Sequence, residues 1–405
     1  MKNKPFFAAL AALIAAATAF VPLGRGSAGS GAVTGALSLT PSVAQADYRF
    51  ADFQGRPPVH IYRAATAKPQ GMTPAAIKKA YNLPSTGGSG TIAIIDAYDD
   101  ATMEADLAVF DKMYGLADCT TKNGCFEKHK MASSTAANSG WAIEESLDVE
   151  WAHAIAPKAK ILLVEAKTPS GANLLSAIDY AAKQKGVVAV SMSWGGAEFS
   201  DEATLDSHFA SASTTNATSS KSSNIVFFAS SGDDGTGASW PAASPYVVGV
   251  GGTTLTLSTS TGKFVSEKAW SGSGGGVSAY ETEPAYQTAY NIAQAKNMRA
   301  IPDVAYNADP ATGYPVYKAP AKSSSKNGWY TVGGTSAGAP QWAAIQALGL
   351  SVALPKLYSD KASSGTLQYF RDITSGANGT CKYYCDARKR YDYVTGLGAP
   401  QTVKF

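Results

Sequence analysis

Ser336 stands in the stretch GGTSAGAP, residues 333–340, where glycines surround it and a helix-like run follows. The segment GTSAG fits the G-x-S-x-G turn of the α/β-hydrolases, in which the acidic residue and the histidine come after the nucleophilic serine. The four histidines of this chain all precede Ser336. The hydrolase order therefore cannot be completed, and Ser336 is either the cap of a helix or a nucleophile with another proton acceptor.

Two carboxylates, Glu144 and Asp148, offer such an acceptor. They lie four residues apart in GWAIEESLDVEWAHAIAP, where apolar residues recur with helical spacing, so their side chains share one helix face. A close carboxyl pair can share one proton while the other group stays ionised. We therefore interpret Glu144 as the base that accepts the Ser336 proton and Asp148 as the residue that orients it. The alternative is a solvated acidic face, to which we assign Glu145 and Glu150.

Asp233 follows the strand-like run NIVFF, in the turn SGDDG. Acyl transfer needs donors at the developing oxyanion, and a protonated carboxyl at the end of a strand can supply one. A simple turn-forming aspartate is the alternative, and Asp234 fits that role better. A neutral Ser-His-Asp hydrolase that uses His60 or His153 stays open as a third interpretation, with an optimum near about pH 7 to 8. Otherwise the helical offset of His153 assigns it to packing or to the surface.

The elements that must position these residues alternate between strand and helix. Short, continuous apolar runs such as TIAIID, AKILLVEA, VVAVSMSW and YVVGVGGT have the character of strands that are covered on both faces. Helix-like segments separate several of them, for example ATMEADLAVFDKMYG and ANLLSAIDYAAKQ. This succession predicts an α/β fold with a doubly wound, mostly parallel sheet and helices on both faces. Catalytic groups then gather beyond the carboxyl ends of the strands.

Composition limits the class of protein. The 405 residues are 45% hydrophobic and 16% charged, with a formal charge of only +3. This near balance gives no electrostatic reason to expect nucleic acid as a partner, and a monomer is the default expectation. The basic start MKNK and the apolar run FFAALAALIAAATAF predict a signal peptide, and hence a secreted, extracellular protein with no membrane contact after cleavage. We expect residues 1–46 to be the signal peptide and a low-complexity segment, and residues 47–405 to be one domain.

The cysteines form two close pairs in the sequence, Cys119 with Cys125 and Cys381 with Cys385. In an exported protein we expect them to be oxidised, and we favour local pairing among the three possible connectivities. A zinc site is the alternative, which is disfavoured because the chain contains only four cysteines in all.

Six motifs in the correct order resemble those of the sedolisins, the serine-carboxyl peptidases related to subtilisin. They are GTSAGAP, the E-x-x-x-D of residues 144 and 148, SMSWGG, SGDDG, WPAASPYVVGVGGT, and RDITSG with YDYVTGLGAP. The match extends from Thr73 to Phe405. The resemblance implies a subtilisin-like fold and an endopeptidase that cleaves protein or peptide substrates in acid.

The resemblance also implies roles for single residues. The implied catalytic residues are the nucleophile Ser336, the general base Glu144, its orienting partner Asp148 and the oxyanion carboxyl Asp233. In sedolisins an acidic residue after the first core strand and the tryptophan of S-x-S-W extend the hydrogen-bond network. Those positions match Asp96 and Trp194, for which a plain strand-end aspartate and a core tryptophan are the alternatives.

Sedolisins also carry one calcium site near the C-terminus, built from two aspartate side chains and backbone carbonyls. The matching positions here are Asp372, Ile373, Arg388, Arg390 and Asp392. Two carbonyl positions that are usually glycine are thus Arg388 and Arg390. A carbonyl ligand depends on the path of the backbone, so the resemblance still implies bound Ca²⁺ in an all-oxygen site. If glycine serves there to allow positive φ, arginine costs stability.

One departure from the family concerns the prosegment. Sedolisins usually have a long folded prosegment, whereas this chain offers at most a few dozen low-complexity residues before the matched part. We expect acid gating instead, because an ionised Asp233 at neutral pH would repel the oxyanion. A second hypothesis is a catalytically silent, secreted binding protein on the same scaffold, against which the presence of all four candidate catalytic residues argues.

Overall fold

The computed structural model describes residues 48–133, 135–210, 225–319, 328–359 and 369–401. The chain divides into two compact units, residues 1–40 and 41–405, and everything described belongs to the second. The signal peptide predicted within residues 1–46 lies outside the described residues. None of the helices in the described part combines the length and the apolar character that a membrane crossing requires.

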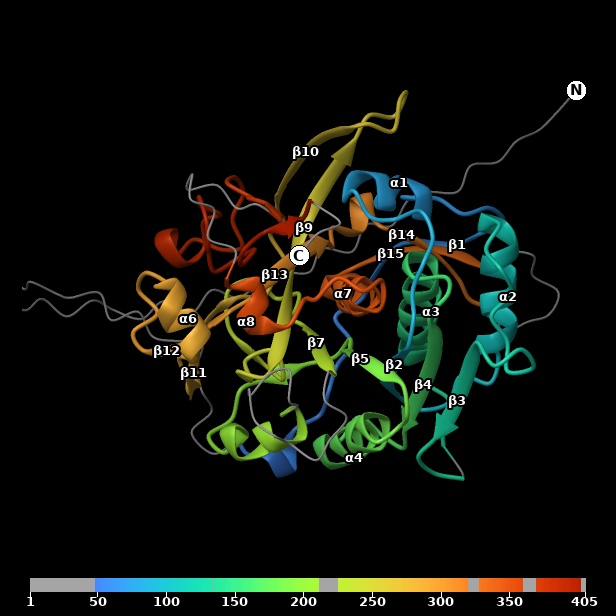
Figure 1. Ribbon diagram of the computed structural model, residues 1–405, viewed down its shortest axis with the longest axis horizontal. Helices are drawn as coiled ribbons and strands as arrows, with labels where there is room; N and C mark the ends of the chain where they lie inside the picture. The colour runs from blue at the N-terminus through green and yellow to red at the C-terminus, as the bar shows by residue number, and fades with distance from the viewer. Residues whose placement is uncertain (1–47, 134, 211–224, 320–327, 360–368, 402–405) are drawn as a thin grey trace, which may run out of the picture. The chain divides into compact units, whose positions relative to one another are not determined.

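One eight-stranded sheet organises the second unit (Figure 1). Its strands lie in the order β10, β9, β7, β5, β2, β4, β3, and β13 also pairs with β9. Every pair is parallel except β10 with β9. The bounds are β2 (Thr91–Ala97), β3 (Phe126–Lys130), β4 (Lys160–Ala166), β5 (Val187–Met192), β7 (Val226–Ser230), β9 (Val247–Leu257), β10 (Phe264–Ala269) and β13 (Val304–Asn307). The predicted mostly parallel sheet is confirmed.

Helices cover both faces of this sheet, as the alternation along β2 shows. Ile94 shares a core with α3 (Ser139–Ile155) and α7 (Gly338–Ala347), whereas Ile95 shares the opposite core with α4 (Gly171–Ala182). Successive side chains of a strand point to opposite faces, so one apolar strand supplies both cores. The other helices are α1 (Pro74–Ala80), α2 (Met103–Tyr114), α6 (Ala285–Tyr290) and α8 (Leu354–Leu357). The predicted doubly wound α/β fold is thus confirmed.

Smaller antiparallel elements surround the main sheet. A three-stranded sheet in the order β1, β15, β14 brings together β1 (His60–Thr66), β15 (Trp329–Gly333) and β14 (Tyr314–Tyr317). Three two-stranded sheets pair β11 (Gly276–Thr282) with β12 (Met298–Ile301), β6 (Gly196–Ala197) with β8 (Ser239–Trp240), and β16 (Phe370–Arg371) with β17 (Ala399–Pro400). The three-stranded sheet places strand β1 next to β15, the strand that leads to Ser336.

Helix α3 is buried along most of its length. Its first turn is capped by Asn138, whose side chain accepts the N–H groups of Gly140 and Trp141. The helix packs against α2, α7, β2 and β14, and every residue from Ile143 to Ile155 is buried. Glu145 and Glu150 are 1% and 0% exposed, and our assignment of both to a solvated face is therefore wrong. Because local spacing is the same on a solvated and a buried helix, only the packing partners distinguish the two.

Both predicted local disulfides are present. Cys119 is bonded to Cys125 and Cys381 to Cys385, with Cα atoms 4.9 Å and 5.2 Å apart. The fold brings His153 beside the first pair, with its ring nitrogen within 4.8 Å of both sulfurs, although His153 is distant from both cysteines in the sequence. The two sulfurs are bonded to each other, so neither is a thiolate that a zinc ion requires.

A buried ion pair anchors the chain between β12 and β13. The Arg299 guanidinium donates to both oxygens of Asp303 at 2.8 Å and 2.5 Å, and neither side chain is exposed. Asp303 also accepts the N–H of Gly249 in β9 at 2.7 Å. Two charges taken out of water in this way persist because each satisfies the other.

We predict that Arg299→Met lowers the free energy of unfolding by about 3–5 kcal/mol, since it leaves the Asp303 charge buried and unpaired. Lys130→Met is the control, because the exposed ion pair of Lys130 with Asp99 should contribute only about 0–1 kcal/mol. Denaturant unfolding at one pH measures both losses. Losses of equal size would contradict the role assigned to the buried pair.

Candidate active site

Ser336 lies in η4 (Thr335–Ala337), the short 3-10 turn between β15 and α7. Its side chain is fully buried, and its hydroxyl donates to the carbonyl of Ser193 at 3.5 Å. The Ser193 hydroxyl donates in return to the Ser336 carbonyl at 3.2 Å. Helix α7 has no side-chain cap, so Ser336 is not the helix cap that the sequence offered as an alternative.

Glu144 and Asp148 face this serine from α3, and both are fully buried. Burial raises the pKa of Glu144 well above its ordinary value, and the charges of Asp148 and Asp96 raise it further. The Ser336 hydroxyl lowers the same pKa, so the serine and the Glu144 carboxyl lie close enough to interact. Neither Glu144 oxygen has a hydrogen bond of regular geometry among the described residues. Ser336 and Glu144 are therefore neighbours, and the Ser336 hydroxyl points toward the carbonyl of Ser193.

Asp148 is held between Glu144 and Ser193. Burial raises its pKa to about 8, while contacts with the Ser193 hydroxyl and the Glu144 carboxyl lower it. As the sequence analysis expected, the spacing of four residues brings the Glu144 and Asp148 carboxyls together on one helix face. Two carboxyls in one dry site lose their protons stepwise, so one proton is retained between them.

Asp96 and Trp194 lie behind this pair. Asp96 is next to last in β2 and fully buried, and its pKa is raised well above the ordinary value by burial, then by the charges of Asp148 and Glu165. The Trp194 indole N–H donates to the carbonyl of Ile95 at 2.9 Å. Trp194 is therefore a core tryptophan, and its hydrogen bond fixes the end of β2 from which Asp96 projects.

The sequence analysis missed Glu165 as a member of this acidic cluster and assigned another member, Glu145, to a solvated face. Glu165 pairs with Asp96 across β2 and β4, and the Lys128 ammonium donates to it at 2.8 Å and to Asp99 at 2.6 Å. Burial raises the pKa of Glu145 well above its usual range, and the charge of Asp96 raises it further. A signal for Glu165 was present, since TIAIIDA and KILLVEA both carry their acid in sixth place. Adjacent parallel strands in register set such residues side by side.

Asp233 lies in the loop after β7, next to the segment that carries Ser336. One carboxyl oxygen accepts both the N–H and the hydroxyl of Thr335, each at 2.8 Å. The other oxygen lies 3.0 Å from His60 Nε2. Burial raises the pKa of Asp233, whereas the hydrogen bond from His60 lowers it. Asp233 therefore connects the segment before Ser336 with His60, a partner that the sequence analysis did not foresee.

Neither histidine of the Ser-His-Asp interpretation contacts the Ser336 hydroxyl in the described residues. His60 contacts Asp233 instead. His153 is fully buried beside Asp111, and its Nε2 lies 3.1 Å from the Ala117 carbonyl oxygen, which agrees with the packing role expected for it.

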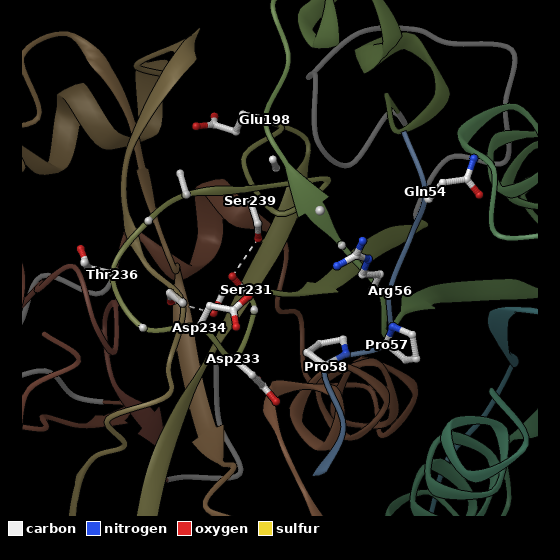
Figure 2. Close-up of a pocket in the computed structure, with 18 of the residues that line it drawn as sticks. Gln54, Arg56, Pro57, Pro58, Glu198, Ser231, Asp233, Asp234, Thr236 and Ser239 are labelled. Atoms are coloured by element: carbon white, nitrogen blue, oxygen red, sulfur yellow. Dashed lines mark hydrogen bonds between the residues drawn. The ribbon is translucent and has the colours of Figure 1, made fainter. Parts of the chain in front are cut away.

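A groove of about 870 Å³ runs past Asp233 (Figure 2). Its walls come from the loop 195–198, the loop 231–239 and the N-terminal segment 54–60. Arg56, Pro57 and Pro58 lie along one wall and Asp233 lies at its end in Figure 2.

The residues at the predicted calcium positions are connected by hydrogen bonds. Asp392 accepts the N–H groups of Arg388, Val394 and Thr395, and burial raises its pKa to about 7. Asp372 accepts the N–H of Arg390 at 3.0 Å, and no cationic side chain makes an ion pair with either aspartate in the described residues. Arg390 has φ of +66°, a value that favours glycine. The two acids thus offer carboxylate oxygens without a cationic side chain, and this is the donor type that a hard divalent cation takes.

We predict that stability falls as pH rises from about 4 to about 8. Asp148 has a native pKa of about 8 against about 3.9 in an unfolded chain, so only the native state keeps this proton in that interval. The contribution of Asp148 to the free energy of unfolding is complete below its pKa in the unfolded chain. It is lost as pH rises through its pKa in the native state. Asp148→Asn should flatten the fall by up to about 1.4 kcal/mol per pH unit.

The exposed Asp118→Asn is the control and should leave the slope unchanged. Thermal unfolding between pH 4 and pH 8 measures the effect. A wild-type melting temperature that rises over this interval would contradict the burial argument.

Comparison with known proteins places the chain in a family. The family model described as the subtilase family matches residues 128–373. Kumamolisin of Bacillus sp. (strain MN-32) is 32% identical over 381 residues, which cover 84% of this chain and 63% of kumamolisin. Sedolisin of Pseudomonas sp. (strain 101) is 27% identical over 384 residues, which cover 84% and 61% of the two chains. The chain thus spans little more than three fifths of the length of these curated relatives.

A solved structure agrees with these relatives. Pseudomonas sedolisin, a serine-carboxyl proteinase complexed with two molecules of pseudo-iodotyrostatin, superposes with a TM-score of 0.67 and 26% identity, over 82% of this chain and 96% of that one. The resemblance to the sedolisins that the motifs indicated is confirmed. The chain belongs to the subtilase family, and the sedolisins are among its relatives.

Proposed function

We propose that this protein is a secreted serine-carboxyl endopeptidase that hydrolyses peptide bonds of protein or peptide substrates in acid. The observation that carries the proposal is the meeting of Ser336 with Glu144 and Asp148 on one side and with the loop of Asp233 on the other. The family relationship supports the class of reaction. The basic and apolar pattern at the start of residues 1–46 supports secretion.

In this mechanism Glu144 accepts the Ser336 proton as the oxygen attacks the substrate carbonyl. Asp148 shares the remaining proton of the pair and orients Glu144. The Ser336 N–H and a protonated Asp233 donate to the oxyanion. The C–N bond then breaks, Glu144 returns its proton to the leaving amine, and water hydrolyses the acyl group on Ser336. Asp96 and Trp194 hold the carboxyl pair in place from behind.

Acid activity follows from the state of Asp233. Burial raises its pKa, so its neutral, donating form extends to higher pH than that of an exposed aspartate. Above that pKa the ionised group repels the oxyanion. The alkaline limb of the pH profile is therefore assigned to Asp233.

We predict that Ser336→Ala and Glu144→Gln each lower kcat by about 10³-fold or more, since each removes a group that acts in the transition state. The matched controls are Ser176→Ala and Glu127→Gln, both of exposed residues outside the site. Hydrolysis of casein and of a quenched fluorescent peptide from pH 3 to 7 measures the rates, and circular dichroism checks folding.

Other outcomes select the other hypotheses. An optimum near about pH 7 to 8 that ignores Glu144→Gln would favour a histidine base. A folded wild type with no activity at any pH, even with added calcium, would favour the silent binding protein.

We also propose that one Ca²⁺ binds at the carboxylates of Asp372 and Asp392 and the carbonyls of Ile373, Arg388 and Arg390. When bound, the ion supplies charge compensation to the two acids and ties their loops together. Its role is stability, and no step of peptide hydrolysis passes through it.

We predict that millimolar Ca²⁺ raises the melting temperature by a few degrees, because saturation at about 100 Kd stabilises by about 2.7 kcal/mol. Asp392→Asn should abolish the rise. Asp386→Asn, on the same loop but outside the ligand set, should retain it. Differential scanning calorimetry with calcium and with a chelator measures the shift, and no shift in wild type contradicts the site.

A further inference from the structure

Glu198 follows strand β6 and lines the groove that runs past Asp233. The two side chains lie well apart in Figure 2, with Ser239 between them in this view. A substrate whose carbonyl oxygen lies at Asp233 therefore meets Glu198 with another part of the molecule. A long side chain suits that separation.

Strand β11 holds the Glu198 carboxylate through two donors. The Ser278 hydroxyl donates to one oxygen, and the N–H of Ala279 donates to the other at 3.1 Å. The Ser278 oxygen itself accepts the N–H groups of Tyr280 and Glu281, at 3.1 Å and 2.8 Å. Its single proton is thus left for Glu198. Hydrogen bonds to a carboxylate favour its charged form.

Glu202 lies behind Glu198, in the 3-10 helix η2 (Glu202–His208), and is fully buried. One of its oxygens accepts the N–H of Phe199 at 2.9 Å, and the other has no hydrogen bond of regular geometry among the described residues. Burial, and then the charge of Glu198, raise the pKa of Glu202 to about 10. Glu202 therefore stays neutral in acid and at neutral pH, and its proton is available to Glu198. The pair carries at most one negative charge, on the member that lines the groove.

The other charged groups on this side leave Glu198 without a cation. Glu281 of β11 and Asp206 of η2 are acids whose pKa burial raises, to about 8 and about 6. The cation that acts on both is Arg299 of β12, which already donates to Asp303. Within the part of the chain that the structure describes, Glu198 is held by neutral donors and forms no ion pair.

The groove itself is richer in acids than in bases. The charged side chains that line it besides Glu198 are Asp52, Arg56, His60, Asp233 and Asp234. Four acids thus stand against two basic residues, one of which, His60, already contacts Asp233. Once the acids are ionised, this excess favours a cationic ligand.

We propose that Glu198 is a specificity-determining residue, which binds the ammonium or guanidinium group of a lysine or arginine side chain of the substrate. The inference rests on the proposed function, since it takes the groove as the place where the substrate lies. Lysine and arginine combine the needed length with a charged end, and their apolar stems can lie along the groove wall. A charge-assisted hydrogen bond to a carboxylate is stronger than one between neutral groups.

The preference for basic side chains should grow as pH rises. Burial raises the pKa of Glu198, while its bonds with Ser278, Ala279 and Glu202 lower it, and the net direction is upward. Well below that pKa Glu198 is neutral and attracts no cation. Loss of the Asp233 proton lowers the rate for every substrate alike, whereas ionisation of Glu198 changes the ratio between a basic and a neutral substrate.

Peptide binding tests the proposal without relying on activity. In the full chain with Ser336→Ala, we measure fluorescence polarisation of peptides that carry a single lysine or its uncharged analogue norleucine at each position in turn. At one position we expect lysine to bind about tenfold more tightly at pH 6.5, the value of one charge-assisted hydrogen bond, and about equally at pH 3.5.

Two variants in that background assign the effect. Glu198→Gln should abolish the preference at pH 6.5, while Glu127→Gln, an exposed residue of β3, should retain it. Circular dichroism checks that both are folded. Equal binding of lysine and norleucine at every position, no binding of any peptide, or a preference that survives Glu198→Gln overturns the proposal.

Glu202 has a positioning role that a second pair of variants tests. Glu202→Gln keeps a neutral donor behind Glu198 and should leave the pH dependence of the preference unchanged. Glu202→Leu removes that donor and should move the onset of the preference to higher pH, since the charged form of Glu198 loses a hydrogen bond. An onset at the same pH in both variants overturns this role.

Kinetics separates the inference from the proposed function. With Ser336 intact, the ratio of kcat/KM for the lysine and the norleucine peptide should rise about tenfold from pH 3.5 to pH 6.5, and Glu198→Gln should remove the rise. Hydrolysis of both peptides with a ratio that ignores pH overturns the role of Glu198 and leaves the peptidase intact. A lysine preference in binding, with no hydrolysis in any chain at any pH, overturns the peptidase instead.

Discussion

The cost of burying acidic side chains is the constraint on which this structure depends. Glu144 and Asp148 project from a helix that is covered along most of its length, and Asp96 reaches the same space from the sheet. In a dry environment a carboxylate is expensive and a carboxylic acid is tolerated. The cluster therefore retains protons well above the pH at which exposed acids lose them. Protonation is therefore what allows so many acids to be buried together.

Two solutions to buried charge occur in the same molecule. Arg299 and Asp303 form an ion pair that is fully buried, in which each charge is satisfied by the other. The acidic cluster around Glu144 and Asp148 has no such balance among the described residues, since the Lys128 ammonium that binds Glu165 is shared with Asp99. An unbalanced cluster must exchange protons as the pH changes. The Arg299–Asp303 pair therefore stabilises the fold, whereas the acidic cluster around Glu144 and Asp148 changes its protonation with pH.

The topology explains how such distant residues meet. Parallel strands end at one edge of a sheet, so β2, β5 and β7 deliver their following residues to the same place. Helix α3 crosses one face of that sheet and supplies the carboxyl pair. Strand β1 runs beside β15, and this pairing carries His60 to Asp233 and lays the preceding residues over Ser336. The beginning of the described chain thus belongs to the site as much as the motifs near its end.

The amino-acid sequence by itself determined whatever depends on local spacing. It predicted the parallel sheet from its apolar runs, the shared face of Glu144 and Asp148 from their separation, and the local disulfides from the nearness of their cysteines. These features depend on dihedral periodicity and on short loops, which act over a few residues.

Only the tertiary structure decided which polar groups are buried and which distant side chains touch. Glu145 and Glu150 have the spacing of a solvated face but are covered by α2, α7 and β14. His60 and Asp233 are far apart in the sequence and meet only because β1 pairs with β15. The physical reason is that desolvation is a property of a side chain's whole surroundings, which the packing of remote segments creates and local periodicity does not encode.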